Sequence, residues 1–145
     1  MKISGSYEFN VPALKVWETL MDPQALEHCI PGCESFNPVG DGEYQAVVSV
    51  GVGPVQGRYS AKIALRDQDP HRSYRLTVEG SSSVGFANGE AVVTLTEQGD
   101  KTTVQVDSDA QVGGTVARVG QRLMGSVAKG MMDRFFGCLR EAAHR

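Results

Sequence analysis

The stretch from Gly113 to Arg145 carries a helical pattern that constrains the whole fold. Apolar residues recur in it at about 100° per residue, and charged residues gather on the opposite side. We expect an amphipathic helix of more than about 25 residues that is too charged to span a membrane. The predicted apolar arc holds Val116, Ala117, Leu123, Met124, Val127, Met131, Phe135, Cys138 and Leu139, and the polar side holds Arg118, Arg122, Lys129, Asp133 and Arg140.

Glycines lower the intrinsic stability of this helix, and methionines make its apolar arc flexible. Gly120, Gly125 and Gly130 lie inside the pattern, and each glycine in a helix interior costs roughly 1 kcal/mol relative to alanine. The helix must therefore be stabilised by what it packs on. Two interpretations fit: the glycines let a sheet approach closely, or small residues and thioethers line a cavity for an apolar guest.

Ahead of this helix, the sequence predicts an antiparallel sheet. Apolar and polar residues alternate over residues 2–9, 34–38, 44–52, 58–66, 74–79, 91–95 and 103–107. Two short helices follow the first strand, and Ile30-Pro31-Gly32 ends the second. The Gly80–Ser83 tract reads as a loop or bulged strand. A sheet with one apolar face needs a cover that only the last helix can supply, so we expect about seven strands wrapped around it in one α+β domain over residues 1–145.

Composition narrows the classes of function. A net charge of −3 argues against generic nucleic-acid binding. Residues 113–145 hold six Lys/Arg and two Asp/Glu, so they carry +4 and the remainder carries −7. This basic stripe is either a solvated helix face or a docking surface for an acidic partner or anionic lipid. No N-terminal signal pattern is visible, which predicts a cytoplasmic protein with at most peripheral contact to the inner face of the cell membrane.

No catalytic or metal centre is predicted. The three cysteines form no CxxC pair and the histidines are scattered, so no metal site is expected. An odd cysteine count without a secretion signal predicts reduced thiols. His28 and Cys29 are neighbours, but adjacent helical residues point about 100° apart and do not form a catalytic pair. Common hydrolase, metalloprotease and phosphate-loop motifs are missing from the sequence.

An ordered set of short motifs covers nearly the whole chain. They are Trp17-x-x-Leu20-x-Asp22-Pro23, Ile30-Pro31-Gly32-Cys33, Gly51-Val52-Gly53-Pro54, Tyr74-x-Leu76-x-x-x-Gly80, Gly89-x-Ala91, Gly113-Gly114, Gly120 and Phe135-Phe136. In this order the chain resembles the CoxG family, the G subunit of carbon monoxide dehydrogenase, within the helix-grip superfamily of START-like (SRPBCC) and birch-pollen-allergen-like proteins.

This resemblance implies a hydrophobic cavity between sheet and C-terminal helix. It also implies a non-catalytic accessory protein of molybdenum hydroxylases of the carbon monoxide dehydrogenase type, with a role in maturation, membrane recruitment or electron transfer by a carried quinone. No cofactor bound covalently is expected, only a quinone or similar lipophilic ligand. Many family members continue into a membrane-binding tail, and none is expected here because the sequence ends at Arg145. A purely structural adaptor and a small-molecule cyclase or dehydratase remain as alternatives.

Candidate site residues follow from strand parity and the helical arc. Tyr59 and Tyr74 are candidate hydrogen-bond donors to a quinone carbonyl, with backbone or water as alternative partners. Arg134 falls inside the apolar arc, where it either extends to solvent or meets a buried anion. Arg118, Arg122, Lys129 and Phe136 are the candidate partner or membrane surface. The predicted ligand-binding set is Trp17, Leu20, Met21, Ile30, Val50, Tyr59, Ile63, Tyr74, Leu76, Phe86, Leu95, Leu123, Met124, Val127, Met131 and Phe135.

Overall fold

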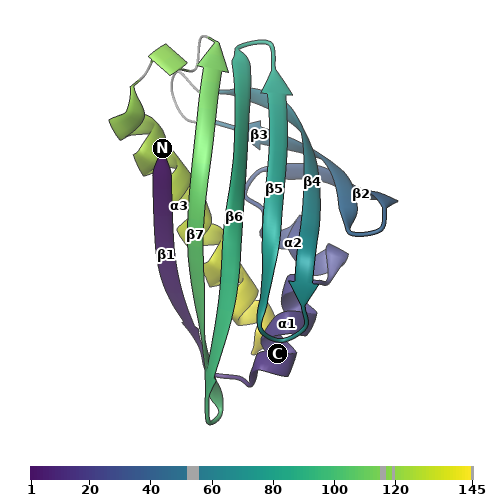
Figure 1. The fold of residues 1–145 in the computed structure, drawn as a ribbon. Helices are drawn as coiled ribbons and strands as arrows, with labels where there is room; N and C mark the ends of the chain where they lie inside the picture. Colours follow the sequence, from purple (N-terminus) through teal and green to yellow (C-terminus); the bar gives the residue numbers. More distant parts are fainter. Residues whose placement is uncertain (52–55, 115–116, 119, 145) are drawn as a thin grey trace.

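One antiparallel sheet and three helices make up the computed structural model (Figure 1). It describes residues 1–51, 56–114, 117–118 and 120–144, so the motif residues Val52–Pro54, the arc residue Val116 and Arg145 lie outside the described part. The elements in chain order are β1 (Lys2–Phe9), α1 (Ala13–Leu20), α2 (Pro23–Cys29), β2 (Cys33–Gly40), β3 (Glu43–Val50), β4 (Gly57–Asp69), β5 (Ser73–Ser82), β6 (Gly85–Gln98), β7 (Lys101–Gly114) and α3 (Gln121–Ala143).

The seven strands lie in the order β1-β7-β6-β5-β4-β3-β2, and every neighbouring pair is antiparallel. This confirms the predicted α+β helix-grip fold with two short helices after the first strand. Apart from β1 and β3, the strands are longer than the alternation predicted. The Gly80–Ser82 tract in particular belongs to β5, because Gly80 pairs with Ala87 and Ser82 pairs with Gly85 of β6.

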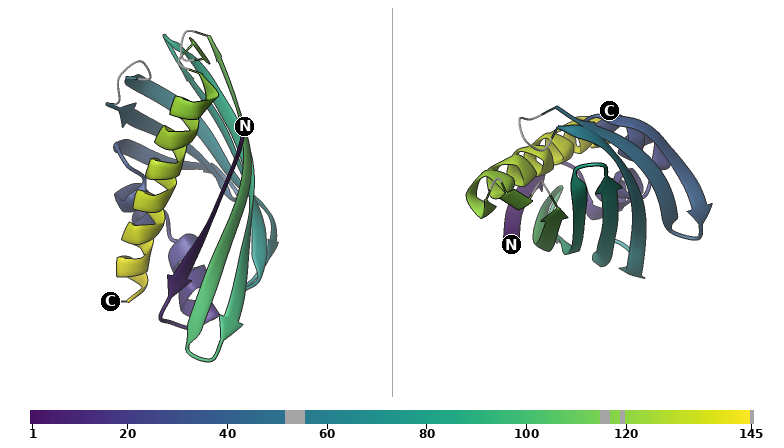
Figure 2. Two further views of the ribbon diagram at one scale, coloured as in Figure 1. Left: turned by 90° about the vertical axis from the view of Figure 1, so that its left-hand side faces the viewer. Right: turned by 90° about the horizontal axis from the view of Figure 1, so that it is seen from above.

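Helix α3 lies along the concave side of the curved sheet (Figure 2). It begins at Gln121 and is 23 residues long, so it is shorter than predicted. The reason is that Gly113 and Gly114 continue the ladder of β7 by pairing with Phe86 and Gly85. Gly120 then precedes the helix with a φ of +86°, a conformation that glycine adopts without strain.

The closed part of the core lies where α1 and the end of α3 meet the sheet. Phe9, Val16, Leu20, Val104 and Leu139 are among its fully buried side chains. Burying a side chain of this size contributes about 1.5–3 kcal/mol, so this cluster anchors the C-terminal half of α3. A second cluster forms where α2 covers β2, β3 and β4, and consists of Leu26, Phe36, Ala46, Val48 and Ile63.

Candidate ligand-binding site

Side chains on the concave face of the sheet change in size along its length. Near α1 they are large and buried, as at Tyr74, Val93 and Leu95. Toward the start of α3 the inward residues of β5 and β6 become small, as at Gly80 and Ala87, and most of the inward positions there are only partly buried. A Cβ built on Gly80 would have Ala87 O at 3.2 Å and Ala61 Cβ at 4.0 Å as its described neighbours, and both belong to the sheet. No described atom of α3 therefore lies within 4 Å of that position.

The facing half of α3 is apolar and incompletely covered. Met124, Val127 and Met131 are half-buried, and Leu123 is 41% exposed. A Cβ at Gly130 would meet no described atom within 4 Å, and one at Gly125 would meet only Met1 Sδ at 3.9 Å. The interpretation that these glycines let the sheet approach closely is therefore wrong.

The predicted ligand-binding residues divide into two groups. Trp17, Leu20, Tyr74 and Leu95 belong to the closed core, with Met21 packed against it. Ile30 ends α2, where it packs against the second cluster and lines a pocket beside Cys29. The others except Phe86 lie on the inward face or the facing helix, where most are only partly buried: Val50, Tyr59, Ile63, Leu76, Leu123, Met124, Val127, Met131 and Phe135. We call this second set, together with Val78 and Ala87, the open apolar face.

Phe86 was assigned to the ligand site, and this assignment is wrong. Residues of β6 that face inward are Ala87, Gly89 and Ala91, so Phe86 has the opposite parity and is 43% exposed on the outer face. Its ring occupies the space where a side chain at the paired Gly113 would stand. Phe86 directly follows a turn, and the sequence there does not indicate to which face of the sheet its side chain points.

Tyr74 is 4% exposed, and its ring meets Trp17 edge-on with the centroids 5.7 Å apart. No hydrogen bond links its hydroxyl to another residue in the described part of the chain. Burial raises the pKa of Tyr74, so the phenol stays protonated and can act only as a neutral donor or acceptor. Trp17 itself is buried and packs in the core.

A polar cluster on α3, which the sequence did not reveal, ties the helix to β1. Tyr7 Oη donates a hydrogen bond to Asp133 Oδ1 at 2.7 Å, and Lys129 Nζ bonds the same carboxylate. Burial, followed by this contact with Asp133, raises the pKa of Tyr7. Hydrogen bonds from Lys129 and then from Tyr7 lower the pKa of Asp133. Lys129 is therefore paired, whereas Arg118 and Arg122 are exposed and form no ion pair with a described residue.

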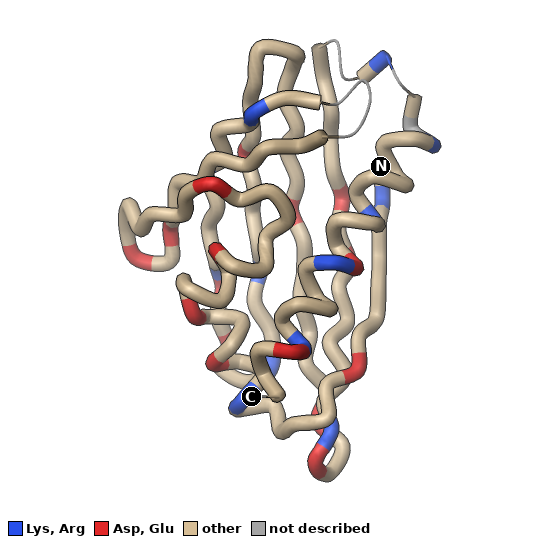
Figure 3. The backbone as a smooth tube through the Cα atoms, turned by 180° about the vertical axis from the view of Figure 1, so that it is seen from behind, with Lys and Arg blue, Asp and Glu red and all other residues tan. Residues whose placement is uncertain are grey.

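Phe136 was expected on a partner or membrane surface, and this expectation is wrong. Its side chain is 4% exposed, and its ring stacks on Tyr7 with the centroids 4.5 Å apart. The cause is the edge strand β1, which packs along α3 and buries a side of the helix that the sequence pattern placed in solvent. Figure 3 shows basic positions along the first part of α3, and both basic and acidic positions along the rest of the helix.

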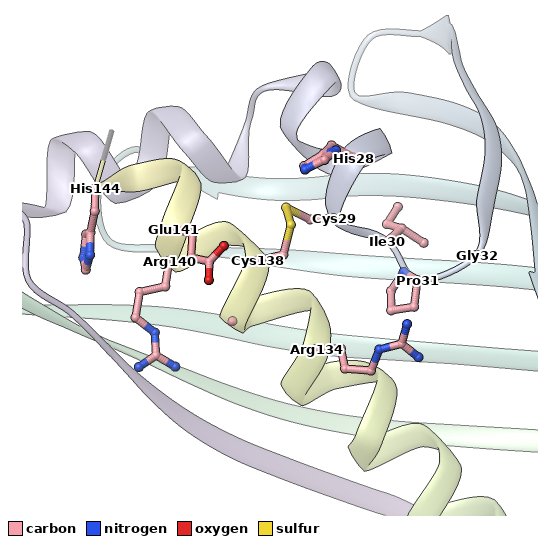
Figure 4. A pocket seen from close by; sticks show the side chains of 11 residues that line it. His28, Cys29, Ile30, Pro31, Gly32, Arg134, Cys138, Arg140, Glu141 and His144 are labelled. Carbon is pink, nitrogen blue, oxygen red and sulfur yellow. A yellow bond between two sulfur atoms is a disulfide. The ribbon is translucent and has the colours of Figure 1, made fainter.

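Cys29 and Cys138 form a disulfide between α2 and α3, with their Cα atoms 5.3 Å apart. The expectation of reduced thiols is thus wrong for this pair, and only Cys33 is free. A separation of 109 residues hides the pairing from sequence reasoning. Both cysteines line a surface pocket of about 710 Å³ (Figure 4). Arg134 is exposed at this pocket, so its side chain extends to solvent rather than into the core.

In the described residues, no group of three or more His, Cys, Asp or Glu side chains is placed to hold a metal ion. Within the same residues, no helix combines the length and apolar character needed to cross a membrane.

Comparison with protein families identifies the chain. The family model described as the G subunit of carbon monoxide dehydrogenase (CoxG) matches residues 5–144. The chain belongs to the CoxG family. No protein with a curated description matches its sequence. A CoxG assignment agrees with an accessory role rather than a catalytic one.

Solved structures support the same fold. A conserved protein from Geobacillus kaustophilus is similar with 36% identity and a TM-score of 0.96, over 99% of this chain and 95% of that one. A START superfamily protein from Mycobacterium smegmatis is similar with 13% identity and a TM-score of 0.77, over 99% and 97%. Ara h 8.0201 is similar with 12% identity and a TM-score of 0.71, also over 99% and 97%. At such low identity the last two show the fold alone.

Proposed function

We propose that this CoxG protein carries a lipophilic small molecule, such as a quinone, against the open apolar face between the sheet and the first half of α3. The observation that carries the proposal is the size gradient of the inward side chains. They fill the space near Val93 and Leu95 but are small at Gly80 and Ala87. Well-packed proteins rarely leave a row of apolar groups half-covered without a use for it.

The chemistry of this face suits an aliphatic or isoprenoid tail. Met124, Val127 and Met131 offer flexible apolar contacts that adapt to different guests. Each CH₂ group moved from water into such surroundings contributes about 0.8 kcal/mol. A tail of a few isoprene units would therefore bind without directional contacts, and its head group would need one or two hydrogen bonds.

Tyr74 and Tyr59 are the proposed donors to a carbonyl of the head group. Tyr74 is favoured because no described residue forms a hydrogen bond with its hydroxyl, and burial of the residue keeps the phenol protonated as a donor. Tyr59 lies further along the inward face, where it is half-buried.

The partner we propose is a molybdenum hydroxylase of the carbon monoxide dehydrogenase type. Family membership supports this, because the CoxG name refers to a subunit of that enzyme. The chain itself offers no redox group, so any electron transfer would depend on the carried molecule. Arg118 and Arg122, both exposed and without an ion-pair partner among the described residues, are the proposed contact with an acidic partner surface or with anionic lipid.

The direct test is extraction of the purified protein with organic solvent, followed by mass spectrometry. We expect a quinone or lipid in stoichiometric amount, and an increase in melting temperature when a quinone is added to the extracted protein. A protein that yields no lipophilic molecule and whose melting temperature ignores added quinone would contradict the proposal. Charge reversal at Arg118 and Arg122 should abolish partner binding while quinone binding survives. If partner binding also survives the charge reversals, Arg118 and Arg122 do not form the proposed contact.

A further inference from the structure

We propose that the Cys29–Cys138 disulfide is a thiol-exchange site, at which a small anionic thiol opens the bond and releases α2 from α3. The inference stands on the position of the bond at a surface pocket, on the charges around it and on how little else holds α2. None of these depends on the ligand proposed above.

The disulfide borders the solvent on the side of a pocket that a small molecule can enter. Both cysteines line this pocket of about 710 Å³, together with Pro31, Arg134 and Glu141 (Figure 4). Cys29 is 4% exposed, whereas Cys138 is partly exposed. An attacking thiolate therefore reaches Cys138 Sγ more easily, and the sulfur of Cys29 is the leaving group.

The charged side chains around the pocket favour a reactant that carries negative groups and, in addition, one positive group. Arg134 stands one helical turn before Cys138 and forms no ion pair with any described residue. Arg140 also lines the pocket, again with no such partner, and Glu141 supplies the one carboxylate there. Low-molecular-weight peptide thiols combine carboxylates with an ammonium group, which these side chains match. Unscreened cations also attract the thiolate form, the reactive species.

The exchange itself is balanced. The thiolate of the small molecule bonds to Cys138 Sγ, the Cys29–Cys138 bond breaks, and Cys29 leaves with the electron pair and takes a proton from water. A second small thiol attacks the mixed disulfide at the small molecule's own sulfur. This frees the Cys138 thiol and yields the oxidised dimer of the small thiol. The protein gains two electrons and two protons, and the small thiol is the reductant.

Helix α2 is the element that this reaction sets free. It has only seven residues, too few for a stable isolated helix, and only Leu26 and Cys29 are buried in it. Leu26 packs in the second cluster against Phe36 and Ile63, and α2 also contacts α1, α3 and β2. Asp22 caps the helix by accepting a hydrogen bond from the Gln24 N–H. Of α2, only Cys29 is buried in the closed core of Phe9, Val16 and Leu139, and Ala25 packs against it. Reduction should therefore loosen α2 without unfolding the sheet.

The test uses the full chain carrying Cys33→Ser, which removes the one free thiol. Folded protein is incubated with reduced glutathione, quenched by alkylation and analysed by peptide mass spectrometry. We expect a glutathione adduct on Cys138, free Cys29, and faster amide hydrogen exchange confined to residues 22–33. A disulfide that opens only in denaturant, or an adduct found on Cys29 alone, would overturn the proposal.

Arg134→Gln tests the charge recognition. This variant should slow exchange with glutathione, whose carboxylates add to the charge of its thiolate, about threefold at low salt. Exchange with 2-mercaptoethanol, whose reactive form carries the thiolate charge alone, should slow less. Arg122→Gln, an exposed arginine that does not line this pocket, is the matched control and should change neither rate. Equal slowing with both thiols, or no slowing with either, would remove Arg134 from the site. All these readouts are made without a quinone, so they remain valid even if quinone carriage fails its own test.

Discussion

Replacing Phe136 by alanine tests the way the edge strand β1 closes over α3. Phe136 is 4% exposed, stacks on Tyr7 at 4.5 Å and meets Phe135 edge-on at 5.0 Å. Truncating a buried phenylalanine typically costs about 3–5 kcal/mol, because transfer energy is lost and a cavity remains. An aromatic pair contributes about 0.5–1.5 kcal/mol beyond its area, so Phe136→Leu, which keeps most of the volume, should cost roughly 1–2 kcal/mol.

Each variant is unfolded at equilibrium in urea. If the dependence of the free energy of unfolding on urea concentration (the m-value) is the same in all of them, a shift in the midpoint measures the change in the free energy of unfolding. Leu123→Ala is the matched control, because Leu123 lies on the same helix but is 41% exposed, and it should cost under about 1 kcal/mol. The reasoning is refuted if Phe136→Ala costs no more than Leu123→Ala. That result would return Phe136 to the helix surface, where the sequence pattern placed it.

Three further substitutions probe other parts of the structure. Gly130→Ala should stabilise the protein by about 1 kcal/mol in thermal unfolding, because the new methyl meets no described atom and the helix gains propensity; destabilisation would show that the sheet does approach there. Glu97→Ala should destabilise α1 by about 1 kcal/mol, since Glu97 Oε2 accepts the Ala13 N–H at 2.6 Å and Pro12 supplies no side-chain cap; an unchanged urea midpoint would contradict this. Asp133→Asn should lower the free energy of unfolding at pH 7, because the pKa of Asp133 is lowered in the folded protein. The difference from wild type should vanish as the pH falls below about 4 and the carboxyl takes up its proton. A difference that stays constant with pH would refute the pairing.

Much of the fold could be predicted from local patterns. Alternation in the strands and the 3.6-residue period near the C-terminus are properties of neighbouring residues, and they identify the sheet and the helix. The end of β7 could not be found in this way. Gly113 and Gly114 suggest a break, yet they continue the strand because β6 pairs with them. Pairing with a distant strand outweighs the local preference of glycine.

The candidate site was predicted less completely, for physical reasons that differ by residue. Val127 and Met131 lie on the helical arc as expected, since periodicity determines their direction. Phe136 was misplaced because a helix can be covered on two sides, here by the sheet and by β1. The Cys29–Cys138 bond and the Tyr7–Asp133 contact join residues more than 100 positions apart, and no local signal records such contacts.

The most direct test of ligand carriage compares two leucine substitutions at adjacent positions of β6 by calorimetric titration with decylubiquinone. Ala87 faces inward on the open apolar face, and Asn88 faces outward and is exposed. Ala87→Leu should fill the space in front of α3 and weaken quinone binding by at least about tenfold, or ~1.4 kcal/mol. Asn88→Leu should bind as tightly as wild type. Equal affinity in all three proteins, or no binding by wild type, would contradict the idea that the space before α3 holds the guest.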